Sequence, residues 1–172
     1  MKICKFIVFM LMCLCLTACN ETTSNEETEQ ATPETKKEYT EEEYKSVCQE
    51  LYYDDVFFGK KDLEGEYVKL HLMLSEKYYF TSKDASSSTF QKYNTKYNLN
   101  TDFYKCCVLR EGDNSYVGKQ INMWFSNNLS LNPNKYHTGE KVIVYAEVIN
   151  WSDNTWDGFN SVTIIPKYIE TE

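Results

Sequence analysis

Few side chains in this sequence are of the kinds that carry out catalysis or bind metals. His71 and His137 are its two histidines, the first within a strand-like pattern and the second within a turn-like Tyr-His-Thr-Gly stretch. There is no histidine pair at metal-ligand spacing, no Cys-x-x-Cys, no Gly-x-Ser-x-Gly and no glycine-rich phosphate loop. We therefore expect no catalytic residues, no metal and no cofactor, and predict that the chain is not an enzyme. A hydrolase built from scattered carboxylates is an alternative that only the folded chain can test.

Residues 153–158 come closest to a metal-binding motif. Their sequence, Asp-Asn-Thr-Trp-Asp-Gly, matches the beginning of a calcium-binding loop, with Gly158 at the sixth position. The twelfth position is Ile164, whereas a calcium loop needs glutamate there. Asp-Gly is also a strong hairpin signal, so we interpret this segment as a turn between two strands.

The beginning of the chain carries the clearest chemical signal. Lys2 and Lys5 precede an apolar run over residues 6–16. This run is too short to span a bilayer comfortably and is typical of a secretory signal peptide. The run ends in Leu-Thr-Ala-Cys at residues 16–19, where two small residues precede Cys19. No later apolar run approaches the length of a membrane-spanning helix.

The Leu-Thr-Ala-Cys sequence resembles the lipobox of bacterial lipoproteins. The resemblance implies that residues 1–18 are a signal peptide and that cleavage makes Cys19 the new N-terminus. It also implies that the Cys19 thiol takes a diacylglycerol thioether, whose two acyl chains give the stable anchoring that one chain cannot. The expected location is the extracytoplasmic face of the cell membrane. The alternative is an ordinary signal peptide with an accidental cysteine.

Residues 19–43 form a region of distinct composition. Glu, Thr, Ser, Asn and Gln dominate it, and nine Glu stand against two Lys, so most of the formal net charge of -8 lies here. With almost no apolar residue the segment cannot offset the entropy of ordering. We predict a disordered acidic tether, which as a flexible chain spans about 25 Å.

One domain is expected over residues 44–172. Its many Tyr, Phe, Val and Ile residues favour strands over helices. Residues 44–58 carry apolar side chains at roughly helical spacing and predict a short helix or two short helical pieces. Residues 81–100 are rich in Ser, Thr, Lys and Asn, and we expect a long excursion there that is partly disordered.

Five strands are predicted in succession. The first covers Glu66–Phe80, whose inward positions are Val68, Leu70, Leu72 and Leu74. The others are expected at Thr101–Glu111, Lys119–Ser126, Lys141–Trp151 and Phe159–Ile169. Since the last two read as a hairpin, the set favours a mainly β fold, a five-stranded, partly open barrel of the OB-fold type preceded by a short helix.

Four segments of this domain support a family resemblance. They are residues 51–56 (LYYDDV), 63–70 (LEGEYVKL), 139–148 (GEKVIVYAEV) and 164–169 (IIPKYI). Together they resemble a class of small bacterial lipoproteins and secreted proteins with an OB-fold domain of the tRNA-anticodon-binding-like kind. That class is mostly uncharacterised, so the resemblance implies a scaffold and no reaction.

The tryptophans are the candidates for ligand contact. In OB-folds, the face of the second and third strands and the loop before the fifth commonly bind oligonucleotides or oligosaccharides. Trp124 lies on the third predicted strand, and Trp151 and Trp156 flank the loop between the last two. These rings could stack on sugars or bases, and the alternative is that they pack within the core and the hairpin.

Three cysteines follow the predicted lipidation site. An extracytoplasmic compartment permits disulfides, and adjacent residues on a strand point to opposite faces. A bridge could therefore join Cys48 to Cys106 or to Cys107, with one thiol left over. The alternative is that all three are small buried hydrophobic residues.

These observations favour a non-catalytic binding or interaction module tethered to the membrane, with a protein, peptide or cell-envelope saccharide as its partner. Single-stranded nucleic acid is an alternative suggested by fold analogy alone. Charge argues against nucleic acid, because phosphate contacts need clustered Lys and Arg, whereas residues 44–172 contain one arginine and carry a net negative charge. A purely structural spacer is a further alternative.

Overall fold

The computed structural model describes residues 38–112, 114–116, 118–154 and 159–172. The predicted signal peptide, Cys19, most of the tether and Trp156 therefore lie outside the described residues. Within the described ranges, no helix is both long enough and apolar enough to cross a membrane.

The described chain begins with a short capped helix, α2 (Glu41–Val47). The Thr40 hydroxyl accepts a hydrogen bond from the backbone N–H of Glu43, and the Glu43 carboxylate accepts one from the Thr40 backbone N–H at 2.9 Å. This capping box satisfies two N–H groups that a helix start leaves unpaired. The helix therefore begins inside residues 19–43, which the sequence assigned to the tether.

A second short helix, α3 (Tyr53–Phe58), follows a three-residue strand, β1 (Gln49–Leu51). Of the two predicted alternatives, one short helix or two short helical pieces, the second is confirmed. β1 was not predicted, because three residues carry too little pattern to identify a strand. Tyr53, Val56 and Phe57 of α3 are almost completely buried. β1 runs parallel to the next strand, so this whole region is fastened to the sheet.

The first long strand, β2 (Tyr67–Tyr79), matches its prediction closely. Val68, Leu70, Leu72 and Leu74 are all buried, as the alternation required. A register shift between Leu74 and Glu76 then changes the alternation in the second half of the strand.

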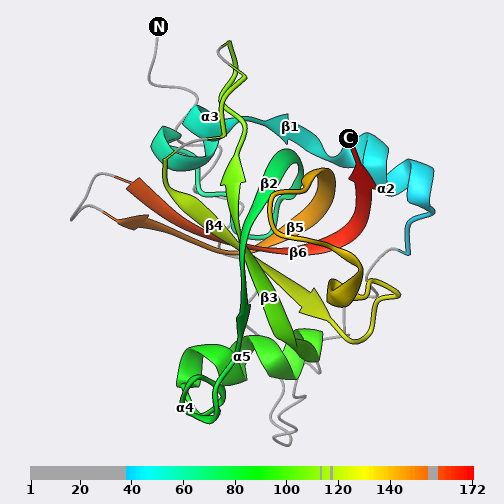
Figure 1. The fold of residues 1–172 in the computed structure, drawn as a ribbon, viewed down its shortest axis with the longest axis vertical. Coiled ribbons are helices and arrows are strands. Elements are labelled where there is room, and N and C mark those ends of the chain that lie inside the picture. Colours follow the sequence, from blue (N-terminus) through cyan, green and yellow to red (C-terminus); the bar gives the residue numbers. More distant parts are fainter. Residues whose placement is uncertain (1–37, 113, 117, 155–158) are drawn as a thin grey trace, which may run out of the picture. The chain divides into compact units, whose positions relative to one another are not determined.

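The remaining strands complete a closed ring. They are β3 (Leu99–Val108), β4 (Gln120–Ser126), β5 (Lys141–Asn154) and β6 (Phe159–Thr171). Going around the ring, β2 pairs with β3, β3 with β4, β4 with β6, β6 with β5, and β5 with β2 (Figure 1). This is the strand order of an OB-fold, and it confirms the predicted mainly β, five-stranded barrel preceded by a short helix. The ring is closed rather than partly open, although β4 and β6 meet over only two residue pairs.

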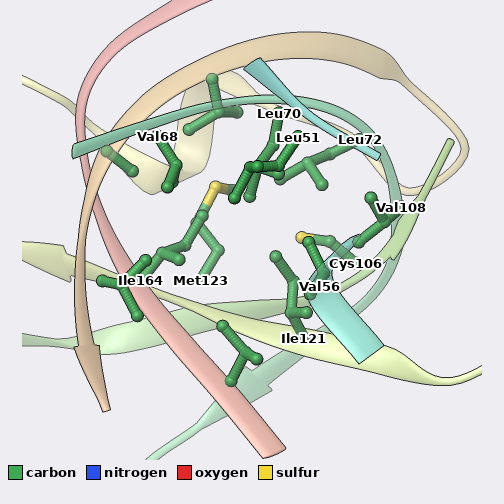
Figure 2. Close-up of a cluster of buried hydrophobic side chains, with 14 of the residues drawn as sticks. Leu51, Val56, Val68, Leu70, Leu72, Cys106, Val108, Ile121, Met123 and Ile164 are labelled. Carbon is green, nitrogen blue, oxygen red and sulfur yellow. The ribbon is translucent and has the colours of Figure 1, made fainter. Parts of the chain in front are cut away.

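Inward-facing side chains fill the barrel. Figure 2 shows them converging from several strands, together with Leu51 of β1 and Val56 of α3. Cys106 lies in this cluster and is fully buried, and burial raises the pKa of its thiol. The interior is thus occupied by apolar side chains and is a core rather than a ligand cavity.

The loop between β4 and β5 contains a short 3-10 helix, η1 (Pro133–Lys135). The buried Tyr104 hydroxyl donates to the carbonyl oxygens of Tyr136 at 2.6 Å and Pro133 at 3.2 Å. These bonds fasten the loop to the barrel core.

The expected disorder within residues 81–100 is wrong. The segment forms α4 (Ser82–Ala85) and α5 (Ser88–Tyr97), which lie at the opposite end of the molecule from α3 (Figure 1). Side chains of Thr81 and Ser87 cap the helix starts, and Asn98 takes the left-handed conformation after α5, with φ of 49°. The many Ser, Thr and Asn residues of this segment suggested a loop, whereas in the structure several of them cap the ends of α4 and α5.

The turn before β4 depends on the absence of a side chain at Gly118. Its φ is +94°, and a Cβ there would lie 2.3 Å from the hydroxyl oxygen of Tyr53, whose ring is buried in the core. Gly112 has a similar φ of +93° with nothing within 4 Å of the same position. Alanine at Gly112 would therefore introduce backbone strain alone, whereas alanine at Gly118 would introduce both backbone strain and steric overlap.

We predict that Gly118→Ala destabilises the protein more than Gly112→Ala does. Gly112→Ala should lower the free energy of unfolding by about 1–2 kcal/mol through backbone strain alone. Gly118→Ala should cost roughly 1–3 kcal/mol more, because the buried Tyr53 ring must also move. Urea denaturation of both variants measures the difference, and equal losses would contradict this role of Gly118.

Candidate functional site: a groove between α5 and β5

A groove lies between α5 and β5, next to the turn that precedes β2. Its cavity volume is about 240 Å³. The residues that line it are Glu64, Gly65, Lys92, Tyr93, Lys96, Tyr97, Glu147, Val148 and Ile149. Three separate parts of the chain therefore meet there.

The α5 wall is a repeated Lys-Tyr pair. Lys92-Tyr93 and Lys96-Tyr97 are four residues apart, which puts both pairs on one face of the helix. Each ammonium nitrogen lies over the ring of the following tyrosine, at 5.0 Å from the Tyr93 centroid and 4.6 Å from the Tyr97 centroid. Phe90 and Tyr93 are buried, and they anchor α5 to the barrel so that both lysines stay exposed.

Glu147 is the main polar group on the β5 side. The Tyr97 hydroxyl donates to Glu147 Oε1 at 2.7 Å, and Lys96 Nζ lies 3.5 Å from the same oxygen. Burial, and then the hydrogen bond to Glu147, raises the pKa of Tyr97, so its hydroxyl keeps its proton. The hydrogen bond between Tyr97 and Glu147 thus joins α5 to β5 at one end of the groove.

The edge of β5 changes partners at this groove. Its pairing with β2 ends where Tyr67 faces Glu147. Two further backbone bonds join Val148 to Gly65 and Glu66, at 2.8 and 2.9 Å. Beyond Val148, β5 pairs with β6 alone among the described strands. The groove therefore borders the start of an open strand edge.

The structure places Trp124 and Trp151 in separate hydrophobic clusters. Trp124 lies under α5, with its ring centroid 5.1 Å from that of Phe80 and 6.0 Å from that of Tyr93. Trp151 packs against the barrel core, which is a separate hydrophobic cluster. In the described part of the chain, the buried Nε1 of each ring has no hydrogen-bond partner. Trp124 and Trp151 thus act here as packing residues, and Trp156 lies outside the described residues.

The disulfide that the sequence left possible is not formed. Cys48, Cys106 and Cys107 are all free thiols. Cys106 faces the barrel core, whereas Cys48 follows α2 and lies within hydrogen-bond distance of the Tyr44 carbonyl oxygen. Burial raises the pKa of the Cys48 thiol to about 11. The alternative expectation, that these cysteines fill apolar space, fits this arrangement.

His71 belongs to a network of carboxylates on the outer face of β2. Its Nε2 lies 2.9 Å from Glu50 and its Nδ1 lies 2.8 Å from Glu172, while Lys69 also contacts Glu50 at 2.9 Å. The Tyr52 ring stacks on the imidazole. The network connects β1, β2 and the end of β6, so His71 has the structural role expected from the sequence.

The backbone N–H of His137 donates to the Glu140 carboxylate at 2.9 Å, consistent with its assignment to a turn. Within the described residues, no group of three or more His, Cys, Asp or Glu side chains is placed to hold a metal ion.

Comparisons with known proteins give no independent assignment of this site. A scan against protein-family models found no match, and a search of the curated proteins found no relative. The resemblance to OB-fold lipoproteins therefore stays a prediction from the sequence.

Sequence reasoning missed the groove, although a signal was present. The repeat of Lys-Tyr at a spacing of four residues is a helical pattern, and it stands in a segment that was read as an excursion. Glu147 had no comparable signal, because nothing in a strand pattern shows which helix lies against it.

The Glu50 network predicts a pH-dependent contribution to stability. Lys69 and then His71 lower the pKa of Glu50 below its ordinary value of 4.5. A carboxyl with a lower pKa in the folded state stabilises the fold above its unfolded-state pKa, and the effect is lost as pH falls through the folded-state pKa. We expect Glu50→Gln to lower the free energy of unfolding near neutral pH by about 0.5–1 kcal/mol, because the pair is partly exposed.

Urea denaturation at several pH values measures this effect. The difference between Glu50→Gln and the native protein should shrink as pH falls below the ordinary pKa of 4.5, and should vanish once Glu50 is protonated in the folded state. Glu111→Gln is the control, since Glu111 is exposed and forms no ion pair among the described residues. A constant difference at every pH would refute the assigned role of Glu50.

Proposed function

We propose that this chain is a bacterial lipoprotein, held at the extracytoplasmic face of the cell membrane by a lipid on Cys19. Its OB-fold domain is a non-catalytic binding module for a protein, peptide or saccharide of the cell envelope. The anchoring part of the proposal is supported by the Leu-Thr-Ala-Cys sequence at residues 16–19 and the apolar run before it.

The binding part of the proposal is carried by the groove between α5 and β5. Concave sites with a few polar groups among apolar and aromatic ones are the usual form of a ligand site. Here exposed lysines stand on the α5 wall, and Glu147, Val148 and Ile149 belong to the β5 wall. The barrel interior offers no such space, because apolar side chains fill it.

We predict that Cys19→Ser abolishes lipid attachment. In cells fed a labelled fatty acid, the native full-length protein should incorporate the label and partition into detergent, whereas the variant should stay unlabelled and uncleaved. Cys15→Ser is the matched control, because Cys15 lies within the apolar run and should be dispensable. Label that persists in Cys19→Ser would contradict the proposed anchor.

We also predict that the groove retains an envelope component. The native full-length protein in lipid nanodiscs is exposed to peptides from digested envelope proteins, to soluble cell-wall saccharides and to single-stranded oligonucleotides. Peptide or saccharide should be retained, and Lys92→Glu with Lys96→Glu should reduce retention by about tenfold or more, because carboxylates replace both ammonium groups of the α5 wall.

Lys83→Glu with Lys135→Glu is the control for that measurement, because both lysines are exposed and neither lines the groove. Its retention should match that of the native protein. Retention of oligonucleotides alone, falling steeply with salt, would replace the proposal with nucleic-acid binding. Retention of no component would reject the binding module.

A further inference from the structure

We infer that His71 is a proton-dependent clip, which fastens the exposed end of β1 to the barrel while both nitrogens of its imidazole ring carry protons. The clip consists of Glu50, His71 and Glu172, and none of these residues lines the groove between α5 and β5. The inference therefore does not rest on the proposed binding function. Loss of one ring proton releases Glu50, and the attachment of β1 then depends on pH.

The first argument is the chemistry of the two ring contacts. Nε2 of His71 lies 2.9 Å from Oε1 of Glu50, and Nδ1 lies 2.8 Å from Oε1 of Glu172. An ionised carboxylate only accepts hydrogen bonds, whereas a neutral imidazole has one N–H donor and one acceptor nitrogen. Both contacts are therefore hydrogen bonds only in the doubly protonated ring. The neutral ring turns a lone pair towards one of the two carboxylates.

The second argument is the small extent of β1. This strand pairs with β2 over three residues, and it has no other strand partner in the described chain. Leu51 is buried in the barrel core, but Gln49 and Glu50 are exposed. Side-chain contacts with β2 therefore hold this end of the strand, namely those of Glu50 with His71 and with Lys69, at 2.9 Å each. Segments with few buried contacts open locally, so the loss of one contact changes how often β1 opens.

The charged and titratable groups around the ring come from five parts of the chain. They are Glu50 and Tyr52 in and after β1, Lys69 on β2, Tyr116 before β4, Lys141 and Tyr145 on β5, and Glu172 after β6. Of these groups, the two carboxylates contact the ring nitrogens, while Tyr52 stacks on the ring.

Lys69 decides which contact the neutral ring keeps. Its ammonium group pairs with the same Glu50 oxygen that His71 contacts, so Glu50 retains a cation when the ring loses its charge. Among the described residues, His71 is the one ion-pair partner of Glu172, which otherwise accepts a hydrogen bond from the Tyr116 hydroxyl at 3.2 Å. The remaining proton therefore stays on Nδ1, where it faces Glu172. The lone pair of Nε2 then faces Glu50, and that contact is lost.

The first test follows ring protonation in the native full-length protein in detergent micelles, with its histidines labelled with nitrogen-15. Nitrogen spectra from about pH 5 to 8.5 cover the range in which histidine titrates. His71→Gln identifies the His71 signals against those of His137. We expect both nitrogens of His71 to be protonated at the acidic end and Nδ1 alone at the alkaline end. A ring that stays neutral or doubly protonated throughout, or that keeps its last proton on Nε2, rejects the clip.

Hydrogen exchange tests the attachment of β1 in the same samples. Protection of the amides of residues 49–51, corrected for the intrinsic pH dependence of exchange, should fall about threefold to tenfold as His71 loses its proton. β4 pairs with neither β1 nor β2, so its amides should show no such step. Glu50 stays ionised across this range, because Lys69 and then His71 lower its pKa. The step therefore reports the histidine and not the carboxylate.

Two variants assign the step. His71→Gln removes the titrating ring, so the amides of β1 should show the lower protection at every pH and no step. His137→Gln is the matched control, because His137 is exposed on the loop before β5, and it should keep the step. A step that persists in His71→Gln, or that is missing from the native protein, overturns the inference. If His71→Gln does not fold, the measurements on the native protein and on His137→Gln still decide. No ligand enters these measurements, so the clip and the proposed binding function can fail separately.

Discussion

The double pairing of β2 is the constraint on which the rest of this structure depends. Its first half pairs with β5 and its second half with β3, with only Leu72 and Met73 paired to both. A strand that changes its neighbours along its length must bend strongly, and the bend, aided by the register shift after Leu74, lets the sheet close on itself. The alternating leucines of β2 then become one wall of a fully enclosed core.

Closure of the barrel also determines where function can be located. A five-stranded barrel is narrow enough for side chains to fill it, so a ligand must be held outside. The long β5–β6 hairpin extends beyond the point where β2 begins, and this mismatch in strand length leaves an edge of β5 without a strand neighbour in the described chain. α5 lies next to that edge, and together they make the groove.

The sequence predicted those elements that depend on interactions between neighbouring residues, and missed those that depend on contacts between residues far apart in the chain. β2 was predicted almost to the residue, because alternation between core and solvent is a local pattern with a period of two. α5 was missed, since its packed face consists of three aromatic residues among Ser, Thr, Lys and Asn. Its stability comes from Trp124, Ile149 and Ile165, which lie on strands distant in the sequence. The packing of Trp124 and Trp151 could not be predicted for a similar reason, because a ring that could stack on a ligand looks in sequence like one that packs under a helix.

The sequence by itself determined the five strands, the inward face of β2 and the mainly β class, because composition and alternation are properties of neighbouring residues. Its contiguous Leu-Thr-Ala-Cys motif likewise predicts lipid attachment at Cys19. Only the tertiary structure decided that the ring closes, that Cys48, Cys106 and Cys107 are free thiols and that Glu147 meets Tyr97. These depend on contacts between residues far apart in the chain, which are fixed by how strands of unequal length pair around a shared core.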